Sequence, residues 1–482
     1  MGISTALNNA LSGLSATSRT TEVISTNLAN ALTEGYSTRK VTLSTSDIAG
    51  GVRVLGIERQ KDQALVADLM LATSEKAGAN TRAEFLQGIE RAIGLPGESQ
   101  SLSDSLAAFE ASIVTAATKP EDENRLNAVL GRATELTEAM KSASGAIQDA
   151  RGRVDSEIGQ LVSEVNVALD QLAKINRTVV SANISGQSAA NLMDQRDQIL
   201  AQLSEAVPVR SVPRENGAIA VFTTGGAILL DGTAAKLEFT TSNVVAPHMT
   251  GDNGLLSGLT INGVAVPPRG DGSPIEGGRL AALFDARDGL AVEAQRNLDA
   301  VARDLMERFE APGPDPTLSP GDAALFTDEG AAFDPADEVG LAGRLSINAL
   351  ADPDQGGELW RLRDGLNAGT PGPAGNSDLL LAMGEALSLP QSMASGDLGG
   401  SARGLSDHIG MLVSKIGQER LTQDQSLSFA NVRHAELSEM QARNAVDSDD
   451  QMQRLLEVEQ AYAANARLIE TINTMMDSLL RI

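Results

Sequence analysis

The 482-residue chain contains no cysteine. It can therefore form no disulfide, no thiolate nucleophile and no thiolate zinc site. This absence fits a cytosolic protein, and it fits equally a protein that crosses a membrane unfolded without becoming cross-linked. Histidine is also scarce, and His248, His408 and His434 lack the spacing of metal ligands. We interpret them as ordinary side chains, with His408 and His434 partly exposed on helices.

Basic charge, long apolar runs and aromatic residues are scarce as well. The net charge of −26 would repel a phosphate backbone, which argues against a nucleic-acid partner. No stretch approaches the roughly 18 apolar residues of a membrane span, so no membrane anchor is expected. The N-terminal MGISTALNNA lacks the basic and apolar regions of a secretory signal peptide. Because aromatic residues make up only 2% of the chain, aliphatic residues must form the core, which suits long helices packed along stripes.

The first 30 residues carry a narrow apolar seam. Its members follow a 4-3-4-3 spacing typical of a coiled coil: Ile3, Leu7, Ala10, Leu14, Thr17, Thr21, Ile24 and Leu28. Arg19 and Glu22 are the only charged residues before Glu34. A helix with so few charges on its outer side is suited to packing against neighbours on more than one side. Asn27 and Asn30 are interpreted as its uncharged hydrogen-bonding groups.

The end of this seam predicts a change of structure. Asn30 is expected to end the helix, and Gly35 to adopt a positive φ in the turn that follows. A strand is expected to start near Tyr36. The sequence leaves open whether Asn27 forms its hydrogen bonds within its own subunit or with the next one.

The last 32 residues carry a second seam of the same kind. Its members are Leu455, Val458, Tyr462, Asn465, Ile469, Ile472, Met476 and Leu479. Asp447 and Asp450 stand where carboxylates satisfy the free amides at a helix start. An isolated helix of this length is marginal in water, so each seam needs a partner. Seams at opposite ends of one chain favour pairing with each other, which would make the terminal domain discontinuous.

Between the seams, the pattern predicts a mainly α protein with a β-rich section. Helices are expected near 61–94, 121–145, 150–182, from after Gly186 to about Leu203, near 280–309 and from 377 onward, and a hairpin near 36–59. The expected domains are a terminal coiled-coil domain of 1–35 with 447–482, an elongated helical core of 36–206 with 281–309 and 376–446, a β-rich section of 207–280, and a small irregular insertion rich in Pro, Gly and Asp at 310–375.

No residue pattern predicts catalysis or cofactor binding. Asp194 and Asp197 would share one helical face with Gln198 while Arg196 points elsewhere, and we interpret them as a solvated face or a charged contact to a neighbouring helix. The acidic turn that begins at Asp352 resembles a calcium loop, but the twelfth position is Arg363 instead of glutamate. We therefore expect no enzyme activity, no catalytic residues, no metal and no cofactor.

Both ends of the sequence resemble a known family. SGLSATSRTTEVISTNLANALTEGYS (12–37) and EVEQAYAANARLIETINTMMDSLLRI (457–482) are similar to the terminal segments of flagellar rod, hook and hook-associated proteins. KPEDENRLNAVLGRATEL (119–136), NLMDQRDQILAQLSEAVPV (191–209) and GGRLAALFDARDGLAVEAQRNLDAVARDL (277–305) resemble segments typical of the hook-associated protein 1 family. Family members often carry a substantial outer domain after the segment near 309, which is small or missing here.

The resemblance implies a structural protein that joins hook to filament. It implies export of the unfolded chain by the flagellar type III route, an extracellular place in the bacterial flagellum, and assembly as a ring of subunits. The implied partners are copies of the chain, the hook protein below, hook-associated protein 3 above and an export chaperone on the C-terminal helix. The terminal helices would be disordered in the monomer and would order on assembly. Two alternatives remain: another axial protein of hook or filament type, and a secreted enzyme whose helical termini only pack.

Overall fold

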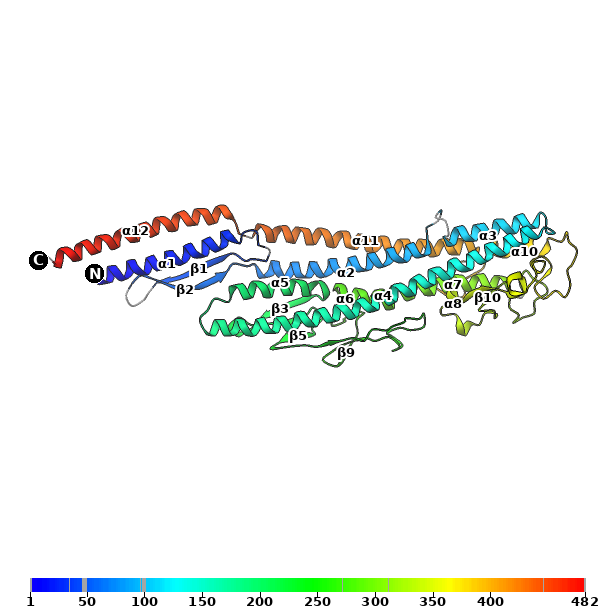
Figure 1. Cartoon of the computed structure of the whole chain (residues 1–482), viewed down its shortest axis with the longest axis horizontal. Helices are drawn as coiled ribbons and strands as arrows, with labels where there is room; N and C mark the ends of the chain where they lie inside the picture. Colours follow the sequence, from blue (N-terminus) through cyan, green and yellow to red (C-terminus); the bar gives the residue numbers. More distant parts are fainter. Residues whose placement is uncertain are drawn as a thin grey trace.

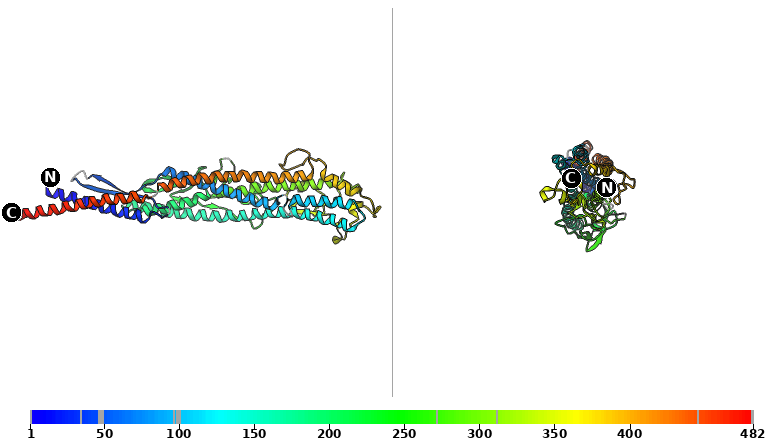
Figure 2. Two further views of the ribbon diagram at one scale, coloured as in Figure 1. Left: turned by 90° about the horizontal axis from the view of Figure 1, so that it is seen from above. Right: turned by 90° about the vertical axis from the view of Figure 1, so that its right-hand side faces the viewer.

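The chain forms an elongated rod of long helices, with both termini at the same end (Figure 1). A view turned by 90° shows the same long, narrow outline (Figure 2). The computed structural model describes residues 2–33, 35–45, 50–95, 97, 101–270, 272–310, 312–444 and 446–480. About 62% of the structure is helical, and the strands form only small sheets. The mainly α fold with a β-rich section is therefore confirmed.

The helices fall into a terminal pair, a long bundle and short turns near the far end of the rod. They are α1 (Ile3–Ala29), α2 (Gln63–Ile93), α3 (Leu102–Ala117), α4 (Glu123–Ile184), α5 (Ala190–Ala206), α6 (Gly278–Asp285), the π-helical turn η2 (Ala286–Leu290), α7 (Ala291–Phe309), α8 (Leu341–Arg344), α9 (Arg361–Asp364), α10 (Asp378–Ser388), α11 (Leu405–Arg443) and α12 (Ser448–Leu480), with single 3₁₀ turns η1 (Glu215–Gly217), η3 (Pro335–Asp337), η4 (Ala349–Ala351) and η5 (Pro353–Gln355).

The strands pair only with antiparallel neighbours. They are β1 (Arg39–Thr45), β2 (Val52–Arg59), β3 (Val209–Pro213), β4 (Ile219–Thr223), β5 (Ile228–Asp231), β6 (Thr233–Ala234), β7 (Leu237–Glu238), β8 (Leu259–Ile261), β9 (Val264–Val266), β10 (Phe326–Asp328) and β11 (Leu345–Ile347). The sheets have the orders β1-β2, β3-β4-β5-β6, β7-β8-β9 and β10-β11. The expected hairpin is the β1–β2 pair, which aligns Arg39 with Arg59.

The expectation of two separate helices over 121–145 and 150–182 was wrong. A single 62-residue helix, α4, spans both segments. Ser144, Ile147, Ala150 and Arg151 stay on its buried face across the gap. The helix starts at Asp122, whose carboxylate accepts a hydrogen bond from the Asn124 N–H at 3.1 Å. A continuous buried face therefore outweighed the interruption in apolar spacing.

Two apolar clusters hold the rod together. One joins the end of α2 and the first half of α4 to α3, α7, α10 and α11, and the other joins the second half of α4 to α5, α6 and the β-rich section. The insertion after α7 contributes Leu325, Phe326 and Leu345 to the first cluster, so it is irregular in outline but packed. Phe326 meets Phe309 edge to face, with ring centroids 5.0 Å apart. Neither cluster includes a described residue of α1 or α12.

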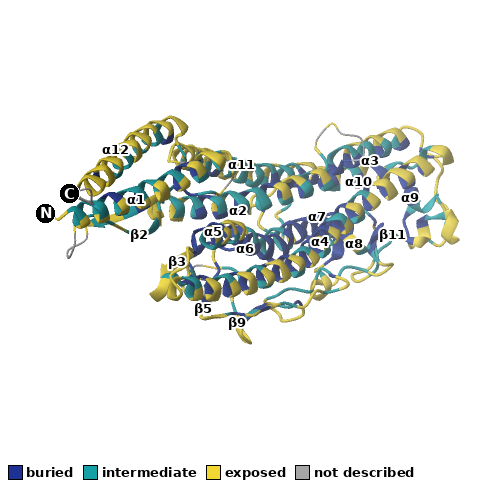
Figure 3. Cartoon of the chain, turned by 60° about the vertical axis from the view of Figure 1, so that its left-hand side comes forward, coloured by how far each residue is buried: buried dark blue, intermediate teal, exposed yellow. Residues whose placement is uncertain are grey.

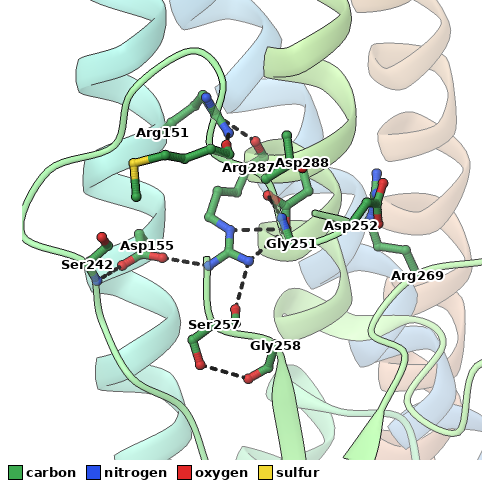
Figure 4. A network of polar contacts seen from close by, with 12 residues as sticks. Arg151, Asp155, Ser242, Gly251, Asp252, Ser257, Gly258, Arg269, Arg287 and Asp288 are labelled. Carbon is green, nitrogen blue, oxygen red and sulfur yellow. Dashed lines mark hydrogen bonds and ion pairs between the residues drawn. The ribbon is translucent and has the colours of Figure 1, made fainter. Parts of the chain in front are cut away.

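Buried charges hold a loop of the β-rich section on the bundle (Figure 4). The guanidinium of Arg287 on η2 lies 2.6 Å from the Asp155 carboxylate of α4 and 2.7 Å from Asp288. Asp155 also accepts a hydrogen bond from the Ser242 N–H at 2.6 Å. Arg151 donates to the Arg287 carbonyl at 3.0 Å. Each of these charges is compensated, as burial requires.

The expectation that His408 is partly exposed was wrong. It is 1% exposed, and its Nδ1 lies 2.9 Å from a carboxylate oxygen of Asp304. Arg308 donates to the same oxygen at 3.0 Å and also to backbone carbonyls near the end of α10. His408 lies between the buried Leu405 and Ile409 on the apolar face of α11, so its helical position placed it inside the bundle. His434, farther along α11, is partly exposed as expected.

Candidate assembly surface and its joint

The two terminal seams meet each other. α1 and α12 lie side by side and antiparallel, with the N and C termini together (Figure 1). Gly13 faces Asn465, and Asn27 bonds to Gln451, which fixes the register of the pair. The expected pairing of the two ends is therefore confirmed.

Each helix of this pair is covered only in part. Ile24 and Ile472 are buried, whereas Leu28, Tyr462 and Met476 remain 36%, 46% and 40% exposed. Of the other predicted seam residues, Ala10 is buried, and the rest are half-buried, namely Ile3, Leu7, Leu14, Thr17, Thr21, Leu455, Val458, Asn465 and Ile469. The side chain of Leu479 lies outside the described residues. A single chain thus covers only part of each seam.

Further apolar side chains face outward around the pair. Leu11, Met452, Leu456 and Met475 are between 45% and 56% exposed. Exposed and half-exposed residues dominate α12, whereas α6 and α7 in the middle of the rod are mostly buried (Figure 3). Clustered exposed apolar residues of this kind mark interaction sites in soluble proteins.

Asn27 is the centre of the joint between α1, the hairpin and α12. It is fully buried. Its amide donates to the Arg39 carbonyl at 2.8 Å and to the Gln451 side chain at 2.9 Å. Its carbonyl accepts from the Tyr36 hydroxyl at 2.8 Å and from the Arg39 N–H at 3.0 Å. All four hydrogen-bonding positions of the amide are therefore satisfied within its own subunit.

The turn after α1 follows the expected pattern. Asn30 is the C-terminal cap of α1, and its side chain donates to the Thr26 carbonyl at 2.8 Å. Gly35 has a φ of +77°, and a Cβ there would lie 2.7 Å from the Gln198 side chain of α5. Tyr36 is half-buried beneath the Arg39 guanidinium, which lies 4.7 Å from its ring centroid. Burial raises the pKa of the Tyr36 hydroxyl, so it stays a hydrogen-bond donor at neutral pH.

Ion pairs fasten the hairpin to the bundle. Asp194 on α5 lies 2.9 Å from Arg39 and 2.8 Å from Arg59. Asp197 lies 2.5 Å from Arg59 and 2.6 Å from Lys61. The expected charged contact is therefore present, but its partner is a hairpin and not a helix. Arg196 points elsewhere as expected and donates to the Gly217 carbonyl at 2.8 Å.

The ion pairs make this joint sensitive to acid. Burial alone would raise the pKa of Asp197, but Lys61 and Arg59 outweigh it and hold that pKa below its usual value. A carboxylate with a depressed pKa stabilises the folded state at neutral pH, and that contribution is lost as the pH falls through the pKa. The joint should therefore be firm at neutral pH and weaken in acid.

Neither a metal-holding group nor a membrane-spanning helix is found among the described residues. Within them, no group of three or more His, Asp or Glu side chains is arranged to hold a metal ion. None of the described helices is long and apolar enough to cross a membrane. The acidic turn at Asp352 is closed by its own carboxylate, which accepts from the Asp354 N–H at 3.0 Å.

Two features of the joint were missed by sequence reasoning. Gln451 is 2% exposed and completes the Asn27 network, yet it lies outside the C-terminal seam. Arg39 and Arg59 lie opposite each other in the hairpin. Two like charges in such close pairing could have predicted an acidic partner. Sequence distance hid that partner, because Asp194 lies 155 positions from Arg39.

Comparisons with known proteins agree along the whole chain. Residues 86–312 match the model of the flagellar hook-associated protein FlgK helical domain. Residues 438–482 match the flagellar basal body rod FlgEFG protein C-terminal model, and residues 7–36 match the flagella basal body rod protein model. The two rod-protein matches coincide with α12 and α1.

The relatives are named flagellar hook-associated protein 1, and one solved structure is named as a flagellar hook junction protein. Flagellar hook-associated protein 1 of Salmonella typhimurium is 24% identical, with all of both chains covered. The Bacillus subtilis protein of that name is 21% identical over all of this chain and 97% of its own. The flagellar hook junction protein FlgK from Burkholderia pseudomallei is 22% identical with a TM-score of 0.45, and the likeness covers 54% of this chain and 46% of that one. Over its whole length the chain is therefore similar to flagellar hook-associated protein 1 of these bacteria, and its residues 86–312 match the FlgK helical-domain model.

Proposed function

We propose that this chain is a structural junction protein that joins the flagellar hook to the filament as a ring of identical subunits. The partly covered terminal pair carries the proposal. Met476 and Tyr462 stay exposed on predicted seam positions, and Leu456 and Leu11 are exposed beside them. A helix surface of this kind gains stability when copies of the same helices pack around it.

The assembly interface comprises the seam residues of α1 and α12. It extends to the turn at Gly35 and Tyr36, where the pair meets the hairpin. Asn27 supports this interface without contacting another subunit. Its hydrogen bonds stay inside one subunit and set the angle at which the pair leaves the rod. The terminal pair would face the inside of the tube, and the bundle and insertion would lie outside it.

Export and position follow from the same proposal. The chain would leave the cell through the flagellar type III channel, unfolded and without a cleaved signal peptide. An export chaperone would bind the C-terminal helix, whose apolar residues are exposed before assembly. In the finished flagellum the hook protein would lie below the ring and hook-associated protein 3 above it.

An axial protein of hook or filament type is the second candidate, since rod-protein models match both ends. The helical-domain match over 86–312 favours the junction protein, because that segment lies outside the shared ends. An exported enzyme is not supported, since the family is structural.

Electron microscopy of a strain that lacks this gene tests the proposal. We expect hooks without filaments, and filament protein shed into the medium. Complementation with the full chain should restore filaments. Filaments of normal length on the mutant hooks would contradict a junction role, and loss of the hooks themselves would point to a rod or hook protein.

Deletion of a terminal segment should separate folding from assembly. We expect chains that lack 1–30 or 450–482 to keep a cooperatively folded middle, because neither apolar cluster includes a described residue of these segments. The same chains should fail to restore filaments. Circular dichroism melting and motility of the complemented strain measure the two effects. A truncated chain that still joins hook to filament would contradict the assigned interface.

A further inference from the structure

A large groove lies where the terminal pair meets the bundle. It has a volume of about 1140 Å³ and is lined by β2, the start of α2, α5, β3 and η1. Leu55 of β2 is 53% exposed within it. Along one side runs β3, an edge strand of its sheet, and the residues after Val209 are exposed. An open edge strand beside exposed apolar residues is a common docking element.

The groove is basic although the chain is strongly acidic. Six cationic side chains and three carboxylates line it, a net charge of +3 against −26 for the whole chain. The cationic members are Arg19, Arg59, Lys61, Arg196, Arg210 and Arg214. Arg19, Arg59, Lys61 and Arg214 are paired with carboxylates nearby. Among the described residues, Arg196 and the exposed Arg210 make no ion pair, so these two carry the positive charge of the groove. Copies of so acidic a chain repel one another overall, so a local basic surface is where another copy can approach.

The opposite face of the molecule is acidic at the same level of the rod. There α11 ends and α12 begins, and α2 separates this corner from α5 (Figure 1). The sequence from 436 to 459 holds seven acidic and two basic residues. Glu457 and Glu459 are exposed and form no ion pair among the described residues. Met440, Met452 and Leu456 are 49%, 45% and 56% exposed beside them.

We propose that the groove of one copy receives the α11–α12 corner of the next copy. The inference rests on the proposed ring and names its lateral contact. A ring needs two different surfaces that fit each other head to tail, and the groove and the corner differ in charge sign as such a pair requires. Because both lie at one level of the rod, rotation about the ring axis brings them together without a large shift along it.

Introduced cysteines can test this contact without background, since the chain has none. Three double variants combine Arg210→Cys with Asp449→Cys, Gln453→Cys or Glu457→Cys. Flagella isolated from complemented strains are treated with a short bis-maleimide and separated under denaturing conditions. We expect a ladder of cross-linked copies for at least one double variant, and none for any of the four single variants. As a matched control, Arg210→Cys with Glu121→Cys at the far end of the rod should give no ladder.

Charge reversal gives an independent readout. Arg210→Glu should reduce incorporation into isolated flagella about tenfold, because it places like charges against each other. Adding Glu457→Arg to the same chain should restore incorporation to within about twofold. Arg132→Glu, an equal charge change on an exposed face of α4, should leave incorporation unchanged.

The outcomes separate this inference from the proposed function. If the chain is absent from isolated flagella, the proposed function fails. If all variants are incorporated but no double variant cross-links, the junction role stands and this contact is wrong. Cross-linking of Arg210→Cys to a different flagellar protein would show that another partner fills the groove, which also overturns the inference.

Discussion

The terminal pair and the bundle bury their helices to very different degrees (Figure 3). In α7, 14 of the 19 residues are buried. In α12, which has 33 residues, only Gln451 and Ile472 are buried among the side chains that the structure describes. The bundle therefore contains within one chain the contacts that stabilise it, whereas the terminal pair has contact surface left over.

This difference distinguishes the helices that are stable in the monomer from those that assembly stabilises. A helix stabilised by buried apolar area persists in the isolated chain. A helix with a half-covered seam is marginal until another surface completes it. Changes in the bundle should therefore affect the free energy of unfolding of the monomer, and changes in the terminal pair should affect the assembled state.

The largest effect is expected for Arg287→Met in the bundle. Asp155 and Asp288 are 0% and 6% exposed. Removing the guanidinium leaves both carboxylates buried without the cation that they share. Breaking a buried pair in this way costs about 3–5 kcal/mol. Urea unfolding of the purified chain measures the loss. Arg132→Met, which removes an exposed pair from α4, is the control and should not move the midpoint. Equal midpoints for the two variants would show that the buried network does not stabilise the bundle.

Asp299 of α7 should make the bundle respond to pH. Burial raises the pKa of its carboxyl to about 6, although the N–H groups of Ala342 and Gly340 and the Gln295 amide act in the opposite direction. The folded state then binds this proton more tightly than the unfolded state, whose carboxyl keeps its ordinary pKa of 3.8. Its stabilising effect is full below about pH 4, declines as the pH rises to about 6, and amounts to roughly 3 kcal/mol by the linkage relation.

Comparison with Asp299→Asn isolates this group. We expect the difference in unfolding free energy between the two chains to change across pH 4–6 and to stay constant above pH 7. Urea midpoints at each pH provide the values, since the other acidic groups titrate alike in both chains. A difference that does not vary with pH would mean that the carboxyl ionises normally.

Sequence reasoning predicted the features that depend on residues close together in the sequence. The spacing of Ile3 to Leu28 gave the helix, Asn30 its end and Gly35 the positive φ, because each depends on neighbours in sequence. The matching far end predicted the pairing of α1 with α12. The partners of Asn27 were beyond such reasoning, since Gln451 lies 424 positions away. Burial of His408 was also missed, because the histidine was judged by residue type alone and not by its place beside Leu405 and Ile409 on the buried face of α11.

Asn27→Ala should loosen the joint without unfolding the bundle. The change leaves the Arg39 backbone groups, the Tyr36 hydroxyl and the Gln451 amide without their buried partner. A loss of this kind costs about 2 kcal/mol, which corresponds to roughly thirtyfold faster hydrogen exchange of the α1 amides near residue 27. Exchange is measured by mass spectrometry on isolated flagella, and the urea midpoint of the monomer should stay unchanged.

Asn30→Ala is the matched control for this joint. Among the residues that the structure describes, its amide bonds only to Thr26 and Thr33 in its own turn. Exchange near residue 27 should then change less than threefold, a difference of about 0.6 kcal/mol. If the two variants behave alike, the network around Asn27 does not hold the pair in place.

The smallest effect is expected when one methyl group is added to each region, at a glycine of the bundle and at a glycine of the terminal pair. At Gly78 of α2, a Cβ would lie 3.0 Å from the backbone oxygen of Gly278, which cannot move away alone. At Gly13 of α1, a Cβ would lie 2.9 Å from the Asn465 amide nitrogen, at the flexible end of a side chain. Alanine gains up to about 1 kcal/mol over glycine inside a helix, whereas crowding a packed site costs about 1–3 kcal/mol. We therefore expect Gly78→Ala to lower the urea midpoint of the monomer, and Gly13→Ala to leave both that midpoint and filament assembly close to normal. Loss of assembly in Gly13→Ala would show that the terminal pair is packed as tightly in the flagellum as the bundle is in the monomer.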